Sequence, residues 1–176
     1  MQQEEVKKAL ERFRKHVVSQ AKRNLTNKQK NSSKKLYKSL KGQVKTMPNS
    51  ISIEFSMEDY GVYQDAGVNG LKVKHGSKYN FRKGHPNTKM LKSLDVWIRR
   101  KGLTPRDSGG KFVKRTGLKF AIARSIFKKG IERSLFFTKP FEEAYKNLPE
   151  ELVEKYGLDA IQLFNQQIDE ILKQNG

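Results

Sequence analysis

Ser50–Gly67, which reads SISIEFSMEDYGVYQDAG, is the stretch of the chain that decides the fold. Ile51, Ile53 and Phe55 alternate with polar residues, a pattern that gives a β-strand one apolar face and one solvated face. The tyrosine- and glycine-bearing segment that follows is expected to form a short turn directly after the strand. It leads into a basic loop that contains no recognisable catalytic motif. We therefore predict a half-buried strand here.

The chain before this strand is expected to be helical. Apolar residues recur at three- and four-residue steps over residues 3–26 and predict a long amphipathic helix. A polar break follows, and Ser32 or Ser33 then caps a second, short helix that Gly42 ends.

A small antiparallel sheet of three or four strands is predicted next. Val44–Met47 and Ile51–Ser56 are its clearest strands, and Pro48-Asn49 supplies the turn between them. Apolar residues alternate with basic or polar ones between Leu71 and Arg82, which predicts a basic hairpin around residues 75–77. The alternative is a disordered loop, because residues 68–90 are rich in Gly, Asn and Lys.

Helical patterns return in the second half of the chain. A helix is expected from Asn87 or Thr88 to Gly102, and another is expected to begin at a Thr116 cap. Residues 104–115 between them have the composition of a loop.

The C-terminal part is also expected to be helical. Pro140 suits the start of one helix, and Pro149 begins another. The final helix is expected to place these apolar residues on one face: Ile161, Phe164, Ile168, Ile171 and Leu172.

A helix, a small antiparallel sheet and several further helices, in that order, are typical of an α+β fold with the helices packed on one side of the sheet. We expect residues 1–135 to form an α+β core domain with long basic loops at 68–90 and 104–115. Residues 136–176 are expected to form a helical extension of the same domain.

The net charge of +19 comes from 37 Lys and Arg residues against 18 Asp and Glu. Residues 1–45 have a net charge of +11 and residues 68–134 a net charge of +16, whereas 46–67 and 135–176 are each at −4. A lone compact monomer with this charge repels itself, so we expect a polyanion or an acidic partner nearby.

Two basic clusters are candidates for contact with DNA or with an acidic partner protein. Basic side chains spread over loops suit contact with phosphates without any reading of bases. A solvated basic face is the simpler alternative, and no zinc-finger spacing, leucine-zipper heptad or helix-turn-helix is recognisable. The candidates are Lys72, Lys74, Lys78, Arg82, Lys83, Arg99, Arg100, Lys101, Arg106, Lys111, Lys114 and Arg115.

No set of residues suggests catalysis or metal binding. The chain has no cysteine, which excludes disulfides and thiolate metal sites and suits a reducing cytosol. His75 and His85 share a loop without any acidic residue, and His16 follows two basic residues on the first helix. Four acids between residues 54 and 65 fit a solvated turn and a helix start better than a nuclease site. We expect no enzyme activity, no metal and no cofactor.

A membrane location is not expected either. No apolar run approaches the ~20 residues that cross a bilayer. The segment Met1–Glu5 is polar and acidic, so we expect no secretory signal.

The segment Tyr60–Gly67 resembles the Tyr-small-x-Tyr-x-x-x-Gly segment that follows a hairpin strand in the tail-completion (neck) proteins of long-tailed bacteriophages. Other features of that family occur in the same order: a long first helix, LYKSL at 36–40, Lys-Gly-Ile at 129–131 and Pro-Phe at 140–141. Tyr60, Tyr63 and Gly67 are therefore candidate motif or interface residues. Core packing beneath the sheet is the more common use of such tyrosines.

The resemblance implies a structural, non-enzymatic virion protein. Its copies would form a closed ring of six- or twelve-fold symmetry at the head–tail junction, with DNA crossing the centre. It implies the portal-side connector and the tail-terminator ring as partners, assembly in the host bacterial cytoplasm, and a monomeric or weakly associated chain until the partner rings are met.

Two alternatives remain open. One is a stand-alone basic nucleic-acid-binding protein, and the other is a metal-dependent nuclease.

Overall fold

The computed structural model describes residues 2–47, 50–82 and 85–146. The contacts divide the chain into two compact units, which are described separately. Unit 1 contains the described residues up to 26, those of 35–59 and those from 136 onward, and unit 2 contains residues 27–34 and the described part of 60–135. The predicted boundary before residue 136 coincides with a unit boundary, whereas residues 1–135 are shared between the two units.

Three predicted features lie outside the described residues. They are the Pro48-Asn49 turn, the helix beginning at Pro149 and the final helix that was expected to contain Ile161.

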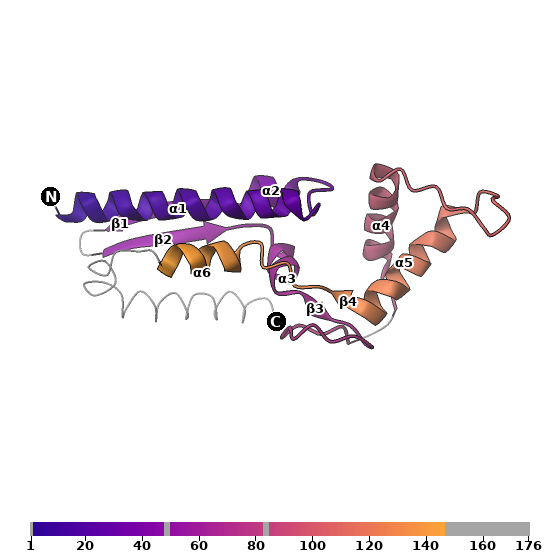
Figure 1. Cartoon of the computed structure of the whole chain (residues 1–176). Helices are drawn as coiled ribbons and strands as arrows, with labels where there is room; N and C mark the ends of the chain where they lie inside the picture. Colours follow the sequence, from indigo (N-terminus) through magenta and orange to yellow (C-terminus); the bar gives the residue numbers. More distant parts are fainter. Residues whose placement is uncertain (1, 48–49, 83–84, 147–176) are drawn as a thin grey trace. The chain divides into compact units, whose positions relative to one another are not determined.

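Unit 1 consists of helices packed against a β-hairpin (Figure 1). The long first helix is α1 (Gln2–Asn27), and the short second helix is α2 (Lys35–Ser39). β1 (Lys41–Met47) and β2 (Ser50–Ser56) pair antiparallel, and α6 (Thr138–Lys146) comes from much later in the chain. These elements were all predicted, although β1 begins three residues earlier than expected.

The apolar face of β2 is covered by aromatic side chains from two helices. The Phe55 ring contacts Phe13 of α1 at a centroid distance of 6.4 Å and Phe141 of α6 at 6.1 Å. Phe13 and Phe141 also contact each other directly, at 5.3 Å, and Phe137 lies 5.3 Å from Phe55. Phe55 therefore packs as the predicted apolar face requires, although residues 51–55 are all half-buried and show no alternation in exposure.

Gly42 lies in β1, although the sequence suggested that it ends the second helix. It pairs with Phe55 across the hairpin. A Cβ atom on Gly42 would come within 3.0 Å of the Phe55 ring and 2.8 Å of the Arg14 side chain. The glycine is thus required by close packing, and α2 ends earlier, at Ser39.

The main core of unit 1 lies between α1, α2 and the segment that leads into α6. Leu25, Leu40 and Phe136 have no exposed surface, and Leu36 is 3% exposed. The Asn24 side-chain amide donates a 3.2 Å hydrogen bond to the Phe136 carbonyl. Burial of each such side chain stabilises the fold by about 1.5–3 kcal/mol, so this cluster ties the two distant segments together.

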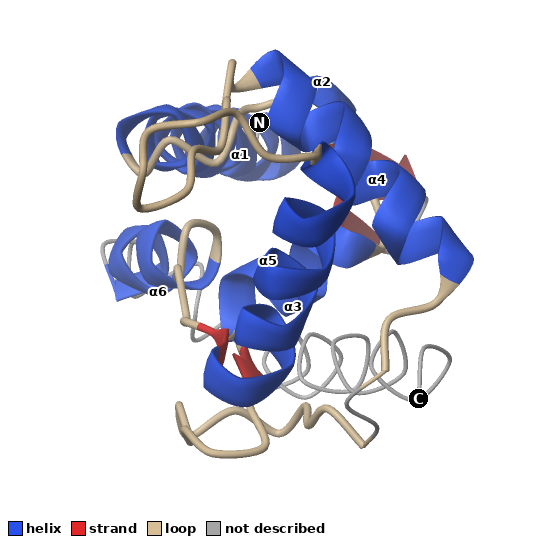
Figure 2. Cartoon of the chain, turned by 90° about the vertical axis from the view of Figure 1, so that its right-hand side faces the viewer, coloured by secondary structure: helices blue, strands red, loops and turns tan. Residues whose placement is uncertain are grey.

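Unit 2 contains three helices and one very short strand pair. The helices are α3 (Tyr60–Ala66), α4 (Thr88–Arg100) and α5 (Arg115–Lys129). β3 (Val68–Asn69) pairs antiparallel with β4 (Gly130–Ile131) directly after the end of α5 (Figure 2).

The helix α3 replaces the turn that was predicted after the central strand. Glu58 and Asp59 precede it, and acidic residues near a helix N-terminus interact favourably with the helix dipole. Gly67 follows its last residue with a φ of +74°, the backbone conformation in which glycine commonly ends a helix. The tyrosine segment is therefore helical.

The α+β class is as predicted, but the prediction of a single sheet of three or four strands was wrong: the described strands form two separate two-stranded sheets. The basic segment 71–82 is neither the predicted hairpin nor a disordered loop: it is an irregular loop ordered by hydrogen bonds, with one isolated bridge between Asn69 and Asn80. The β3–β4 pair was not predicted, because two-residue strands are too short for an alternating pattern to be visible.

The two longer helices of unit 2 pack against each other. The Asn87 side chain caps α4 by accepting a 2.8 Å hydrogen bond from the Met90 amide, and the helix begins at Thr88, one of the two predicted start positions. α5 begins one residue before the predicted Thr116 cap, and its N-cap residue, Lys114, makes no capping side-chain hydrogen bond. Ile98 of α4 is fully buried.

Candidate anion-binding surface

The net charge of the protein is concentrated in unit 2. The described residues of unit 2 include 21 Lys and Arg against 4 Asp and Glu, a net charge of +17. Those of unit 1 include 13 Lys and Arg against 8 Asp and Glu, a net charge of +5. Every predicted contact residue falls in the range of unit 2, and all but Lys83 lie among the described residues. The candidate anion-binding surface therefore lies on unit 2.

Three of the four described acids of unit 2 are buried or have partners within the unit, and the fourth, Glu132, is exposed. The Asp95 carboxylate lies 3.4 Å from Arg99 and 3.9 Å from Lys119, and so joins α4 to α5. The Asp107 carboxylate accepts hydrogen bonds from two backbone amides of its own loop. Asp65 is 6% exposed. These acids offset little of the positive charge on the exposed surface.

The first basic cluster lies on a loop that closes the C-terminal end of α5. We call residues 70–82 the capping loop. The Leu71 amide donates to the Phe127 carbonyl at 2.8 Å, and the Lys72 amide donates to the Lys128 carbonyl at 2.9 Å. The last carbonyls of a helix have no partner within the helix, so the loop supplies the missing donors. This helix-capping role was not predicted from the sequence.

His75 takes part in the same cap. Its Nε2 atom lies 2.7 Å from the Lys129 carbonyl oxygen, and because a carbonyl only accepts, the ring donates this hydrogen bond. Within the described ranges, no three His, Cys, Asp or Glu side chains are grouped so that they could hold a metal ion. The absence of a metal and of enzyme activity remains a prediction.

Asn69 holds the capping loop together from inside. It is 7% exposed, and its side-chain nitrogen donates to the Ser77 carbonyl at 2.5 Å and to the Asn80 side chain at 3.0 Å. Its side-chain oxygen accepts from the His75 amide at 2.7 Å. The sequence shows only an Asn-Gly pair at 69–70, a turn signal that does not reveal this role.

Glycines allow the backbones on the two sides of this cap to approach closely. A Cβ atom on Gly70 would collide with the Lys128 carbonyl, and one on Gly130 would collide with the Val68 carbonyl. Gly130 also has a φ of +82°, which side-chain-bearing residues rarely adopt. The capping loop and the start of β4 therefore form one closely fitted backbone structure.

The predicted cations of the capping loop remain exposed, and some of them also have local roles. Lys72, Lys74, Lys78 and Arg82 are all exposed. The Lys74 ammonium donates to the Gly70 carbonyl at 3.2 Å. Cations near a helix C-terminus are stabilised by the helix dipole. Part of this positive charge therefore stabilises the end of α5.

The second basic cluster lies on and around the loop between α4 and α5. We call residues 101–114 the α4–α5 loop. Its backbone is ordered by hydrogen bonds from Val113 to Pro105 at 3.0 Å and from Asp107 to Lys111 at 2.9 Å. The predicted residues on or next to it are all exposed: Arg99, Arg100, Lys101, Arg106, Lys111, Lys114 and Arg115.

The two clusters lie at opposite ends of α5 (Figure 1). The α4–α5 loop leads into Arg115 at the helix start, and the capping loop contacts the carbonyls at the helix end. A helix of 15 residues is about 22 Å long at 1.5 Å per residue. That length corresponds to about six base-pair steps of 3.4 Å, so the clusters form two separate contact regions.

The three motif residues have different environments. Tyr60 is 43% exposed. The Tyr63 ring packs edge-on against Tyr79 of the capping loop, at 4.7 Å. Burial, with a smaller contribution from Tyr63, raises the pKa of the Tyr79 phenol. A Cβ atom on Gly67 would lie 2.7 Å from the Ile131 carbonyl, so this glycine has a packing role.

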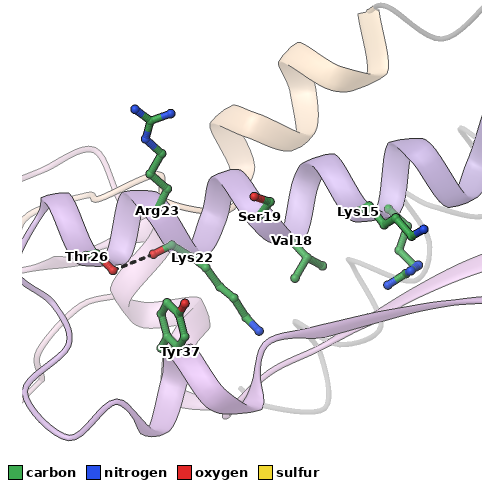
Figure 3. A pocket seen from close by; sticks show the side chains of 8 residues that line it. Lys15, Val18, Ser19, Lys22, Arg23, Thr26 and Tyr37 are labelled. Carbon is green, nitrogen blue, oxygen red and sulfur yellow. Dashed lines mark hydrogen bonds between the residues drawn. The ribbon is translucent and has the colours of Figure 1, made fainter.

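A basic groove in unit 1 was not predicted. It has a volume of about 500 Å³ and is lined by Arg14, Lys15, Val18, Ser19, Lys22, Arg23, Thr26 and Tyr37 (Figure 3). Arg14 is already bonded to Glu11 and to the Gly42 carbonyl, at 2.7 and 3.0 Å. The Lys22 ammonium lies 5.2 Å from the centre of the Tyr37 ring. Two of its cations therefore already have partners within the unit.

The comparisons with known proteins give no relative for this chain. Neither models of protein families nor searches among curated proteins and solved structures produced a match. Among the described helices, none has the length and apolar character that crossing a membrane requires.

Proposed function

We propose that the chain is a structural protein of the head–tail junction of a tailed bacteriophage. In this proposal unit 2 contacts the DNA, and unit 1 is the apolar scaffold of the subunit. The observation that supports it most is the division of charge, a net of +17 on unit 2 against +5 on unit 1. The order of family-like segments from Tyr60–Gly67 to Pro140-Phe141 supports the phage assignment.

The chemistry of unit 2 suits phosphate contact without base recognition. Its cations are exposed and occupy loops at both ends of α5, an arrangement that follows a polyanion and does not enter a groove as one reading helix. Each phosphate that is neutralised releases counterions, so binding should weaken steeply with salt.

Assembly into a ring follows from the same charge. Copies that each present a net of +17 on one unit repel one another in free solution. DNA or acidic partner rings remove that repulsion, and contacts that close on themselves then yield a ring of defined size. We expect the purified chain to be monomeric or weakly associated, with the portal-side connector and the tail-terminator ring as its partners.

The test is a phage that encodes this chain and carries an amber mutation in its gene. Electron microscopy of a non-permissive lysate should show filled heads and complete tails that are not joined. Joined, infectious particles without the protein would contradict the proposal. Light scattering of the purified chain is the second measurement, and a stable ring in isolation would argue against assembly on partners.

A stand-alone nucleic-acid-binding protein is the second candidate, because the same cations support it. Gel-shift titrations with short duplexes separate the two. Both candidates predict a steep salt dependence, so the affinity decides: tight binding by the isolated chain favours the stand-alone protein, and weak binding favours a ring that meets DNA only when assembled.

A nuclease is the third candidate, and the structure offers it little support. The Glu54 carboxylate is bonded to Lys45 at 2.6 Å and to Gln43 at 2.9 Å. These hydrogen bonds, that of Lys45 first, hold the pKa of Glu54 below its ordinary value. Incubation of a plasmid with the protein and Mg²⁺ or Mn²⁺ should leave the plasmid intact.

A further inference from the structure

The α4–α5 loop presents an aromatic ring to solvent. Phe112 is 68% exposed, more than any other large apolar side chain among the described residues. The Arg106 guanidinium lies over this ring, 4.1 Å from its centre. One face of the ring is thus covered by a cation, and the other face is open.

The ring is held on an ordered backbone. Arg106 and Phe112 form a bridge across the loop, and the Arg106 guanidinium also donates to the Gly110 carbonyl at 2.9 Å. The Asp107 side chain fixes the turn between them by accepting from the Gly109 and Lys111 amides. Phe112 is therefore positioned before any ligand arrives, which lowers the entropy lost on binding.

We propose that the open face of Phe112 stacks on an unpaired nucleic-acid base while the cations beside it contact the adjoining phosphates. Exposed aromatic rings among basic residues are the usual means of binding single strands, because every base offers a flat face for stacking. Lys111 and Lys114 flank Phe112 closely in sequence and are exposed. The inference rests on the proposed contact between unit 2 and nucleic acid, and adds unpaired bases as the ligand.

A base explains the arrangement better than an apolar pocket on a protein. Insertion of Phe112 into such a pocket would take the Arg106 guanidinium out of water or break its contact with the ring, and burial of an unpaired cation is costly. A base that stacks on the open face leaves Arg106 at the hydrated edge, near the phosphates. Unpaired bases of this kind occur in single strands and at frayed duplex ends.

The test is fluorescence anisotropy of the full chain with two labelled probes, an oligo(dT) and a blunt duplex, each of about 20 nucleotides per strand. Base stacking on an aromatic ring contributes about 1–3 kcal/mol, so Phe112→Ala should weaken oligo(dT) binding by about 5- to 150-fold. Duplex binding should change less than about twofold, and the salt slope of both probes should not change, because no charge is removed.

Two further variants control the experiment. Phe112→Leu keeps an apolar side chain and should lose nearly as much oligo(dT) affinity as Phe112→Ala. Phe120→Ala removes another exposed ring, 46% exposed on α5, and should have no effect. Circular dichroism checks that each variant is folded.

The outcomes separate this inference from the proposed function. If Phe112→Ala weakens the binding of both probes equally, or of neither, the base-stacking inference is overturned. The proposed phosphate contact still holds in that case if the duplex binds. If neither probe binds at low salt, the proposal that the free chain contacts nucleic acid is contradicted, and the base-stacking inference is contradicted with it.

Discussion

The two units are stabilised by different interactions. Unit 1 is held by apolar packing, with the rings of Phe13, Phe55 and Phe141 in mutual contact and Phe136 without exposed surface. In unit 2 the segment that joins α3, β3 and the end of α5 depends on backbone hydrogen bonds, the Asn69 side chain and closely approaching glycines.

This difference in stabilisation is related to the high positive charge of unit 2. The like charges of a unit with a net charge of +17 repel one another. When the apolar core is small, its burial alone does little to offset this repulsion. In the capping loop, some basic residues contribute directly to the structure, because they lie at the negative end of α5. The predictions below test this contrast between a packed unit and a hydrogen-bonded, cationic unit.

The largest expected effect is in the core of unit 1. Phe136→Ala should lower the free energy of unfolding by about 3–5 kcal/mol, because it leaves a cavity between α1 and α2. Denaturant titration measures the change. Phe112→Ala is the matched control, with the same substitution at an exposed position, and should change stability by less than about 0.5 kcal/mol. Similar losses for both would mean that the packed core is wrongly assigned.

The next effect is in the backbone of unit 2. Gly130→Ala introduces a Cβ atom that collides with the Val68 carbonyl, in a residue whose φ and ψ of +82° and −167° suit glycine alone. We expect a loss of about 3 kcal/mol or more. Gly110→Ala has a similar φ of +79° but open space around it, and should lose only about 1–2 kcal/mol. Equal losses would show that strain, and not close approach, makes Gly130 necessary.

A smaller effect is expected when the side chain that organises the capping loop is removed. Asn69→Ala leaves partly buried backbone groups of the loop without partners and should destabilise unit 2 by about 2 kcal/mol. Hydrogen exchange should then be faster in residues 70–82. Asn80→Ala removes an exposed partner of the same network and serves as the control, with a change below about 1 kcal/mol. Unchanged exchange in Asn69→Ala would refute this role.

The smallest effect concerns pH and unit 1. The pKa of Glu54 is lowered in the folded protein, chiefly by its hydrogen bond from Lys45. The stabilisation of the folded protein by this carboxylate is therefore present above the unfolded pKa of Glu54, and it is lost as the pH falls through the folded pKa. Glu54→Gln should have a slightly lower melting temperature than the wild type at pH 7, and the two should converge in acid. A constant difference across this range would contradict the assignment.

The sequence predicted the elements whose patterns are local. The three- and four-residue repeat identified α1, the alternation of Ile51, Ile53 and Phe55 identified β2, and the start of α4 was predicted at Asn87 or Thr88. Each of these signals is complete within one segment, so no tertiary information is needed to read it.

The features that were missed depend on segments far apart in the chain. The β3–β4 pair has only two residues in each strand, and the role of the capping loop becomes visible only when α5 lies beside it. The basic residues of the candidate surface were identified from composition, but His75 and Asn69 were not recognised as structural. Charge alone does not separate residues that cap a helix from residues that await a ligand.

The most direct test of the central claim, that unit 2 and not unit 1 contacts phosphates, is the salt dependence of duplex binding. Two variants remove three exposed charges each: Lys101→Gln, Lys111→Gln and Lys114→Gln in unit 2, and Lys7→Gln, Lys15→Gln and Arg23→Gln in unit 1. With salt varied between about 50 and 200 mM, the unit 2 variant should lose about 0.9 from the slope of log K against log salt for each lost contact. The unit 1 variant should keep the wild-type slope. Equal reductions in both variants would contradict the account.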